Sequence, residues 1–303
     1  VYRSTDRAAT WVRRSAGADI AAGALTEIGL CEGNPDVAYV TTQENGGPTI
    51  YKTIDKGDNW TMVLTDPEAS NFPAGVTVGR DWMTLGFGWA WGEEAHEIGV
   101  SSADANYVAF SEDGRTFRSN DGGQAWFCCN SRETSLNSNW WPSMGFETTT
   151  NYRTHFAPWD HDKAYITYTD MGFFRSEDRA ESWRLAVQGS PYRNTFYDIA
   201  FDPTISGKMW AVASNNHDLP HEKMLRQSGF PTFTGAVLKS TNSGASWTSL
   251  GHPTGSNNNG AVTSILVDPT STQGTRTLYS AVMGKGVYKS TNAGANWVPL
   301  AGG

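Results

Sequence analysis

The sequence is poor in cysteine, with three residues among 303. Cys31, Cys128 and Cys129 are too few for the disulfide framework that stabilises many secreted domains. Cys128 and Cys129 are neighbours in a predicted strand, where successive side chains point to opposite faces, so we expect two free, buried thiols. No Cys or His spacing matches a metal site, and neither a metal nor a cofactor is expected.

Basic residues and long apolar runs are also scarce. Lys and Arg number 23 against 31 Asp and Glu, giving a formal charge of −8, which argues against the basic face that a nucleic-acid partner needs. No apolar run approaches the length of a membrane-spanning helix, and no signal peptide is present. Because the chain starts at Val1 and not at Met, we expect it to be a trimmed or excised segment.

A repeated hairpin is what the sequence has in abundance. Each copy carries an apolar pair, a basic residue, a Ser or Thr, an Asp or Asn three positions after the basic residue, a tight turn and a closing Trp. The copies are VYRSTDRAATW (1–11), IYKTIDKGDNW (50–60), TFRSNDGGQAW (116–126), FFRSEDRAESW (173–183), VLKSTNSGASW (237–247) and VYKSTNAGANW (287–297). Repetition on this scale is typical of β-propeller blades.

The hairpin pattern resembles the Asp-box, or BNR, repeat. Its Asp or Asn is expected to accept backbone N–H bonds inside the turn, and its Trp to pack between neighbouring sheets. The six acid or amide residues are therefore interpreted as structural: Asp6, Asp55, Asp121, Asp178, Asn242 and Asn292. The repeat is a strong signal for the fold and a weak one for function.

The predicted fold is an all-β propeller of four-stranded antiparallel blades, forming a single domain over residues 1–303. Inner strands are expected at 27–30, 97–100, 155–158, 198–201 and 264–267, which gives five complete blades plus an N-terminal half blade. Unpaired edges of a half blade are unfavourable, so we expect completion by a longer polypeptide, a second propeller domain or a partner chain. The alternative is a displaced closure that uses residues 13–25.

Three long insertions fall on one rim of the predicted blades, at 66–96, 130–151 and 215–234, and this favours a binding site there. Two of them contain five tryptophans: Trp82, Trp89, Trp91, Trp140 and Trp141. Indole rings suit the C–H faces of pyranose rings, although the same side chains could instead pack the loops onto the propeller. Alignment of the inner strands also places Glu27, Glu97, His155, Asp198 and Ser264 at equivalent positions near the channel mouth. This ring could bind a ligand or do acid–base work, or it could be a solvated funnel.

The segment AYITYTDMGFFRSED (164–178) differs from the other blades, because a short turn places Asp170 on the rim. It resembles the catalytic turn, TD-x-G-G or GD-x-G-G, of family 74 glycoside hydrolases, the xyloglucanase family. Thr169, Asp170 and Gly172 match, while Phe173 replaces the second Gly. MGFETT (144–149) is similar to the Gly-x-Glu-Glu-Thr segment of that family, with Thr148 in place of the second Glu.

The resemblance implies that Asp170 is one of two carboxyls of an inverting hydrolase, which stand about 6.5–9.5 Å apart. Glu147, Glu97 or Asp198 could supply the second, as could a residue outside this chain, since members of the family use two facing propellers. A turn-forming Asp is the alternative interpretation of Asp170. Further candidate substrate-binding residues are Tyr152, Arg153, His155, His217 and His221, the last two in a loop that could hold a base with its orienting carboxylate, Asp218 or Glu222.

The leading hypothesis is therefore a secreted carbohydrate-active propeller that acts on a neutral or weakly charged polysaccharide. Sialidases share the repeat but need an arginine triad and a Tyr/Glu pair, which Arg80, Arg153 and Arg226 do not obviously form. The alternative is a non-catalytic propeller that binds a protein or a glycan within a larger assembly.

Overall fold

The regular secondary structure of the described residues is almost all β-strand. The structure, a computed structural model, describes residues 1–14, 24–44, 47–92, 95–112, 114–142, 151–216, 233–256 and 259–300. Within these ranges the helices are α1 (Trp82–Phe87) and the short 3-10 helix η1 (Gln273–Thr275). The chain divides into two compact units, unit 1 (Val1–Glu133) and unit 2 (Thr134–Gly303), which are described separately below.

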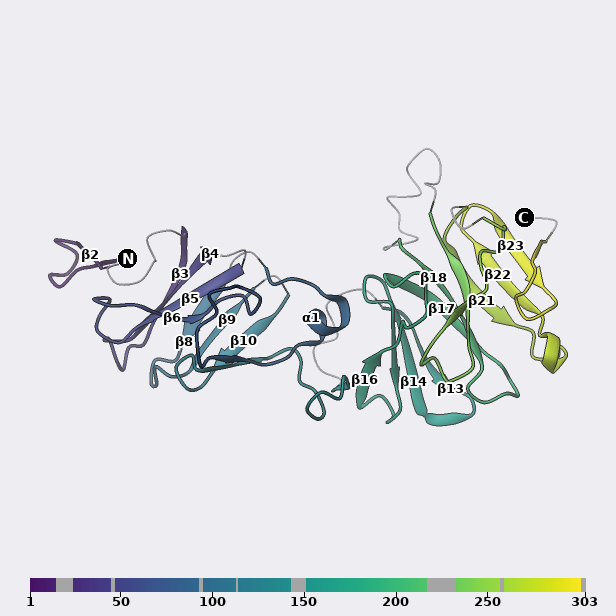
Figure 1. Ribbon diagram of the computed structural model, residues 1–303, viewed down its shortest axis with the longest axis horizontal. Coiled ribbons are helices and arrows are strands. Elements are labelled where there is room, and N and C mark those ends of the chain that lie inside the picture. The colour runs from purple at the N-terminus through teal and green to yellow at the C-terminus, as the bar shows by residue number, and fades with distance from the viewer. Residues whose placement is uncertain are drawn as a thin grey trace. The chain divides into compact units, whose positions relative to one another are not determined.

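Unit 1 contains three sheets (Figure 1). The first is the hairpin of β1 (Tyr2–Arg3) and β2 (Val12–Arg13), and the second has the order β3 (Ala24–Leu30), β4 (Ala38–Glu44), β5 (Gly47–Thr53), β6 (Thr61–Leu64). The third has the order β7 (Thr77–Val78), β11 (Ala125–Cys128), β10 (Thr116–Ser119), β9 (Val108–Ser111), β8 (Glu97–Val100). Sequential antiparallel strands of this kind are the pattern of propeller blades.

Unit 2 also contains three sheets. The first has the order β12 (Trp141–Pro142), β16 (Ser182–Leu185), β15 (Phe173–Ser176), β14 (Asp160–Tyr168), β13 (Asn151–Ala157). The second runs β17 (Thr195–Phe201), β18 (Met209–Ser214), β19 (Ala236–Ser240), β20 (Thr248–Ser249), and the third β21 (Val262–Val267), β22 (Leu278–Val282), β23 (Gly286–Ser290), β24 (Val298–Pro299). All five predicted inner strands lie at a sheet edge and overlap the observed β3, β8, β13, β17 and β21.

Two sheets depart from the predicted four antiparallel strands, because rim insertions add a fifth. β7 comes from the insertion at 66–96 and pairs with β11 in parallel, while β12 comes from the next insertion and pairs with β16 antiparallel. Each addition covers the outer edge of its sheet, which would otherwise expose unpaired backbone groups. The insertions are thus partly built into the sheets.

The six repeated hairpins share one set of turn bonds. In the last copy Ser290 Oγ donates to Asn292 Oδ1 (2.9 Å), Gly294 N donates to Ser290 Oγ (2.9 Å), and Asn296 N donates to Asn292 Oδ1 (2.8 Å). The other five copies repeat these bonds at the same spacings. Gly294 has φ 93°, a conformation that glycine adopts without steric cost. The structural interpretation of the six Asp or Asn residues is therefore confirmed.

Three of the closing tryptophans join their hairpin to the one before it. Nε1 donates to a backbone carbonyl in the pairs Trp60–Arg14 (3.0 Å), Trp126–Val63 (3.0 Å) and Trp247–Ala186 (2.8 Å). In every case the acceptor lies three residues beyond the closing Trp of the preceding hairpin. Trp11, in the first hairpin, is instead 59% exposed, whereas these three indoles are buried.

Apolar side chains fill the spaces between neighbouring sheets of each unit. In unit 1, Tyr39, Phe110 and Trp126 belong to one buried cluster that joins the sheet of β3–β6 to the sheet of β8–β11. In unit 2, Phe173 and Trp247 meet at a centroid distance of 5.1 Å in a corresponding cluster. Burial of each large apolar side chain contributes about 1.5–3 kcal/mol, so packing between sheets is the main source of stability.

The cysteines are free, as predicted, but the predicted burial of both neighbours is wrong. Cys129 is exposed and Cys128 half-buried, because β11 ends at Cys128 and Cys129 lies beyond the paired strand. Among the described residues, no helix is long and apolar enough to cross a membrane.

Candidate functional site

The turn at residues 169–172, between β14 and β15, carries Asp170. Tyr168 N donates to the Gly172 carbonyl (2.8 Å) and Met171 N to the Thr169 carbonyl (2.7 Å), so these residues close a tight turn. Asp170 has φ 62°, in the left-handed region that Asp tolerates better than most residues. The turn thus fixes the backbone of Asp170 at this end of the sheet.

The same turn is anchored to the neighbouring sheet. Gly172 N donates to the Asn194 carbonyl (2.9 Å), and Gly172 forms a bridge with Thr195, the first residue of β17. Asn194 Nδ2 donates to Asp170 Oδ1 at 3.3 Å, and the Asp170 side chain is half-buried. A Cβ at Gly172 would lie 2.5 Å from the Arg193 carbonyl oxygen, so this close approach requires glycine. Asp170 is therefore positioned by two sheets.

The inner strands place one side chain from each sheet at a matching register. The pairs are Glu27–Thr41, Glu97–Ser111, Arg153–Thr167, Asp198–Val212 and Ser264–Ala281. Arg153, and not His155, holds this position in β13, so the predicted alignment was wrong by two residues. β13 continues through Ala157, past a register irregularity between Phe156 and Ala157. The alignment based on sequence did not include this irregularity, and it therefore matched His155 to the position that Arg153 occupies.

Asp198 is the most heavily bonded of these side chains. Its Oδ1 accepts from Ile199 N (3.0 Å), and its Oδ2 accepts from Ser264 Oγ (2.8 Å) and Ile265 N (3.2 Å). The Nε of Arg153 lies 3.3 Å from Oδ1. The carboxylate is buried, so these four donors replace the water it has lost. Asp198 thus joins three inner strands, β13, β17 and β21.

His155 lies two residues deeper along β13, on the same face as Arg153. Its Nε2 is 3.9 Å from Asp198 Oδ1, beyond hydrogen-bond distance, and has no hydrogen-bond partner among the described residues. Burial lowers the pKa of His155, and the nearby Asp198 carboxylate only partly opposes this shift. The imidazole is therefore neutral at pH 7. Arg153, with a side chain 55% exposed, is the member of this group open to solvent.

The other predicted polar site residues are not brought to this group by the described structure. Glu97 is exposed on β8, in unit 1. Glu147, His217 and His221 lie outside the described residues. Tyr152 is half-buried, and its ring centroid is 5.0 Å from that of Tyr197. Among the described residues, no group of three or more His, Cys, Asp or Glu side chains is placed to hold a metal ion.

Burial divides the five rim tryptophans into two groups. Trp82, Trp91 and Trp141 are buried; Trp91 stacks on Phe117 with a centroid distance of 4.6 Å. These three indoles pack the insertions onto the sheets and have little surface to offer a ligand. Trp89 is 36% exposed, and Trp140 is half-buried with the Arg175 guanidinium 5.7 Å above its ring. Only Trp89 and Trp140 therefore have indole surface for stacking.

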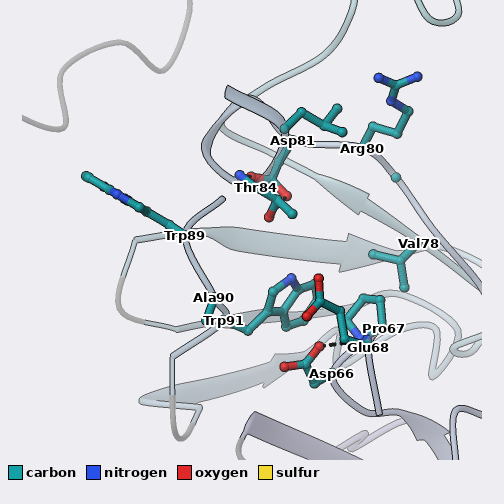
Figure 2. A pocket seen from close by; sticks show the side chains of 12 residues that line it. Asp66, Pro67, Glu68, Val78, Arg80, Asp81, Thr84, Trp89, Ala90 and Trp91 are labelled. Carbon is teal, nitrogen blue, oxygen red and sulfur yellow. Dashed lines mark hydrogen bonds between the residues drawn. The ribbon is translucent and has the colours of Figure 1, made fainter. Parts of the chain in front are cut away.

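A pocket of about 190 Å³ opens within the insertion that carries Trp89. Figure 2 shows its walls, with Asp66 and Glu68 close to the Trp91 indole and the Trp89 ring directed away from them. Val78, Leu85 and Ala90 add apolar surface, and Asp81 and Thr84 lie on the other side; the remaining lining residues are Pro67, Gly79 and Arg80. The pocket belongs to unit 1.

A buried arginine that the sequence did not single out holds this insertion in place. Arg115 donates to Asp81 Oδ1 (3.1 Å), Glu112 Oε1 (2.9 Å) and the carbonyls of Trp89 (2.9 Å) and Ala90 (3.3 Å). Glu112 Oε2 accepts from Gly92 N at 2.6 Å. The insertion is therefore fixed by charge-assisted bonds on the side facing the sheet. No local pattern distinguishes Arg115 from a surface arginine, so only the tertiary structure reveals its role.

The architecture just described, sequential four- and five-stranded sheets closed by repeated hairpins, is of the propeller class. No family model matches the sequence, and no curated protein matches it. The solved structures similar to this chain include the GH74 enzyme of Niastella koreensis (TM-score 0.58, 15% identity) and the GH74 xyloglucanase from Xanthomonas campestris (TM-score 0.55, 14% identity). The matches cover 98% and 97% of this chain and 37% of each of those chains.

The fold thus resembles that of family 74 glycoside hydrolases, which confirms the predicted resemblance at the level of fold. The chain spans a little over a third of the length of the two enzymes it matches. YCF48 bound to D1 peptide is also matched, at 14% identity, over 92% of this chain and 67% of that chain, with a TM-score of 0.30.

Proposed function

We propose that the chain is a secreted, carbohydrate-active propeller that hydrolyses glycosidic bonds by an inverting mechanism. In this proposal residues 1–303 form one propeller domain, with five complete blades and an N-terminal half blade. One carboxyl group protonates the glycosidic oxygen as the bond to the anomeric carbon breaks. A second carboxylate removes a proton from the water molecule that attacks that carbon from the opposite face.

The observation that carries the proposal is the placement of Asp170. Its turn, TDMG, is tied to two sheets through Gly172 and Asn194 and presents a half-buried carboxyl at the end of β14. β13 is antiparallel to β14, so Arg153 near the start of β13 belongs to this end of the sheet. A fixed carboxyl and an exposed guanidinium at the same end of one sheet are suited to acid–base work on a bound sugar.

The identity of the second carboxyl is part of the proposal. Asp198 already accepts three hydrogen bonds and faces Arg153, so we assign it the role of positioning Arg153. Glu147 and Glu97 remain candidates within this chain, together with a carboxyl supplied from outside it. Tyr152, Arg153 and Trp140 are proposed to contact the polysaccharide, and His217 and His221 to extend that surface.

Turnover of a panel of polysaccharides tests the assignment. Wild type should release reducing ends from at least one glycan, with the anomer of inverted configuration formed first in a proton NMR time course. Asp170→Asn should lose this activity, because Asn preserves the left-handed turn but cannot exchange a proton. Glu147→Gln and Glu97→Gln then identify the second group. Equal turnover by Asp170→Asn and wild type would refute the catalytic role of Asp170.

A second candidate function, a scaffold that binds another polypeptide, is favoured by one observation. The Arg14 carbonyl, just beyond the first hairpin, accepts a hydrogen bond from Trp60 Nε1. Trp11 of the first hairpin is itself 59% exposed, and Tyr2 and Val12 are exposed as well. The indoles of Trp60, Trp126 and Trp247 donate to a carbonyl just beyond the hairpin before them, so a strand of that kind is the partner that fits Trp11.

A peptide of residues 182–188 tests this second candidate, because it contains the Ala186 carbonyl that Trp247 uses. Binding to the full chain that Trp11→Ala abolishes, combined with no turnover of any glycan, would favour the scaffold. Absence of binding at millimolar peptide would count against it.

A further inference from the structure

We propose that the unit 1 pocket is a subsite for one sugar unit of an uncharged polysaccharide, and that its carboxylates exclude uronic acids. The inference rests on the proposed carbohydrate activity and names the substrate class that this surface selects. The pocket lies in unit 1, whereas Asp170 lies in unit 2, so the subsite can be tested independently of catalysis.

The size of the pocket fits a single sugar ring. Its volume of about 190 Å³ corresponds to about six water molecules at liquid density. Pockets for drug-sized ligands are larger, at roughly 300–1,000 Å³. One pyranose ring of a chain can enter, while the adjoining units lie over the exposed surface of Trp89 and Leu85 at the mouth.

The chemistry of the walls matches the two sides of a pyranose ring. Val78, Leu85 and Ala90 offer apolar contact to ring C–H groups. Asp66 and Glu68, close to the Trp91 indole in Figure 2, carry carboxylates that accept hydrogen bonds from sugar hydroxyls. A mixture of apolar surface and a few acceptors is what distinguishes a sugar site from a purely apolar cleft.

The charges of the lining select against acidic sugars. Asp66 and Glu68 place two carboxylates in the lining, and the guanidinium of Arg80, which also lines the pocket, has its Nε 3.5 Å from Glu133 Oε2. The third lining carboxylate, that of Asp81, is buried and paired with Arg115. Arg115, behind the pocket, is neutralised by its ion pairs with Asp81 and Glu112. A uronate carboxylate would enter a negative field without a dedicated cation, whereas a neutral hydroxyl would not be repelled.

The pocket is held ready for a ligand. Arg115 fixes the carbonyls of Trp89 and Ala90 and pairs with Asp81, which accepts from Thr84 N (2.8 Å), so this part of the lining is tied to one buried network. On the other side, Asp66 Oδ1 accepts from Glu68 N (2.8 Å). A site that needs little ordering on binding loses less affinity to conformational entropy. The hydrogen-bonded lining is therefore proposed to keep its shape when a sugar binds.

Calorimetric titration of the full chain with cellohexaose and with hexagalacturonate tests the proposal. Wild type should bind cellohexaose and bind hexagalacturonate at least about tenfold more weakly. Ala90→Phe, which fills the pocket, should weaken cellohexaose binding by about tenfold or more. Ala74→Phe, an exposed position in the same insertion and outside the pocket, is the matched control and should bind as wild type.

Two further measurements keep the outcomes distinct. Hydrogen exchange of residues 66–91 should slow with cellohexaose, and Glu68→Gln should raise the affinity for hexagalacturonate relative to cellohexaose. Equal cellohexaose affinity in wild type and in a folded Ala90→Phe variant would overturn the subsite. A chain that binds cellohexaose and turns over no glycan would refute the catalytic proposal alone. A chain that turns over glycans with unchanged Ala90→Phe affinity refutes the subsite alone.

Discussion

Asp170 and Asp178 stand eight residues apart at opposite ends of β15, and their surroundings differ sharply. Asp178 accepts from Ser176 Oγ (2.8 Å), Ser182 N (2.9 Å) and Ser182 Oγ (2.6 Å), all within its own hairpin. Asp170 accepts a longer bond from Asn194 Nδ2, at 3.3 Å, so its side chain reaches across to the neighbouring sheet. The Asp178 carboxylate forms the hydrogen bonds that close its own turn, whereas the Asp170 side chain projects from a turn closed by backbone bonds.

We propose that this difference separates a structural acid, Asp178, from a catalytic one, Asp170, within one sheet. Burial alone would raise the pKa of Asp178, but its hydrogen bonds from Ser182 and Ser176 outweigh burial, so the pKa is lowered. A carboxylate with its bonds already satisfied stabilises the fold and has little capacity left for substrate. Asp198 belongs to the inner strands, but its carboxylate also accepts several hydrogen bonds. In this respect it resembles Asp178 more than Asp170.

The largest expected effect on stability comes from the buried ion pairs at the end of β17 opposite the Asp170 turn. Asp202 is fully buried, with Arg276 Nη2 at 2.9 Å and Lys208 Nζ at 3.2 Å. Arg276→Ala should lower the free energy of unfolding by about 3–5 kcal/mol, because it leaves a buried carboxylate with one cation fewer. Arg179→Ala, which removes an exposed pair with Asp162, is the control and should cost at most about 1 kcal/mol. Urea denaturation measures both, and similar losses would contradict this distinction.

The next largest change in the free energy of unfolding is expected at a buried closing tryptophan, and an exposed one serves as its control. Trp247→Phe should lower the free energy of unfolding by about 2 kcal/mol, because the Ala186 carbonyl loses its buried donor and the packing is reduced. Trp11→Phe should change it by less than about 0.5 kcal/mol, since Trp11 is exposed. Thermal unfolding of both variants is the measurement. A large effect at Trp11 would show that its indole is already packed against a partner surface.

A smaller effect is expected at Asp178 itself, and it should depend on pH. Asp178→Asn should cost at most about 1 kcal/mol at pH 7, because Asp178 is exposed and Asn keeps the turn bonds but not their charge assistance. The folded-state pKa is lowered, so the stabilisation is present above the unfolded pKa, about 3.9, and is lost as pH falls through the lower folded value. The difference between wild type and variant should therefore shrink below about pH 4. A difference that stays constant from pH 7 to pH 2 would contradict this role.

The hairpins could be predicted from sequence because their bonds are local. Ser290, Asn292 and Gly294 lie within five residues, and every donor and acceptor of the turn is encoded at a fixed spacing. The inner strands could be located in a similar way, since the same order of strands and turns recurs between successive hairpins. The resemblance to family 74 enzymes also rested on such local patterns, and the fold agrees with it.

The parts that could not be predicted depend on contacts between distant residues. The extension of β13 through Ala157 shifted the alignment by two residues, so Arg153 was found where His155 was expected. The network of Arg115 with Asp81 and Glu112 has no sequence signature, because its partners come from separate loops. Sequence could not decide which tryptophans pack and which are exposed, since burial of Trp91 depends on its stacking against Phe117.

The account depends most on the contrast between the two acids of this blade. Its most direct test is kcat/KM of Asp170→Asn and Asp178→Asn on one glycan that wild type hydrolyses, with unfolding measured on the same samples. Asp170→Asn should lose about 10²–10⁴-fold in kcat/KM with near wild-type stability, while Asp178→Asn should keep kcat/KM within about twofold and unfold more easily. Full activity in Asp170→Asn, or equal losses in the two variants, would contradict the account.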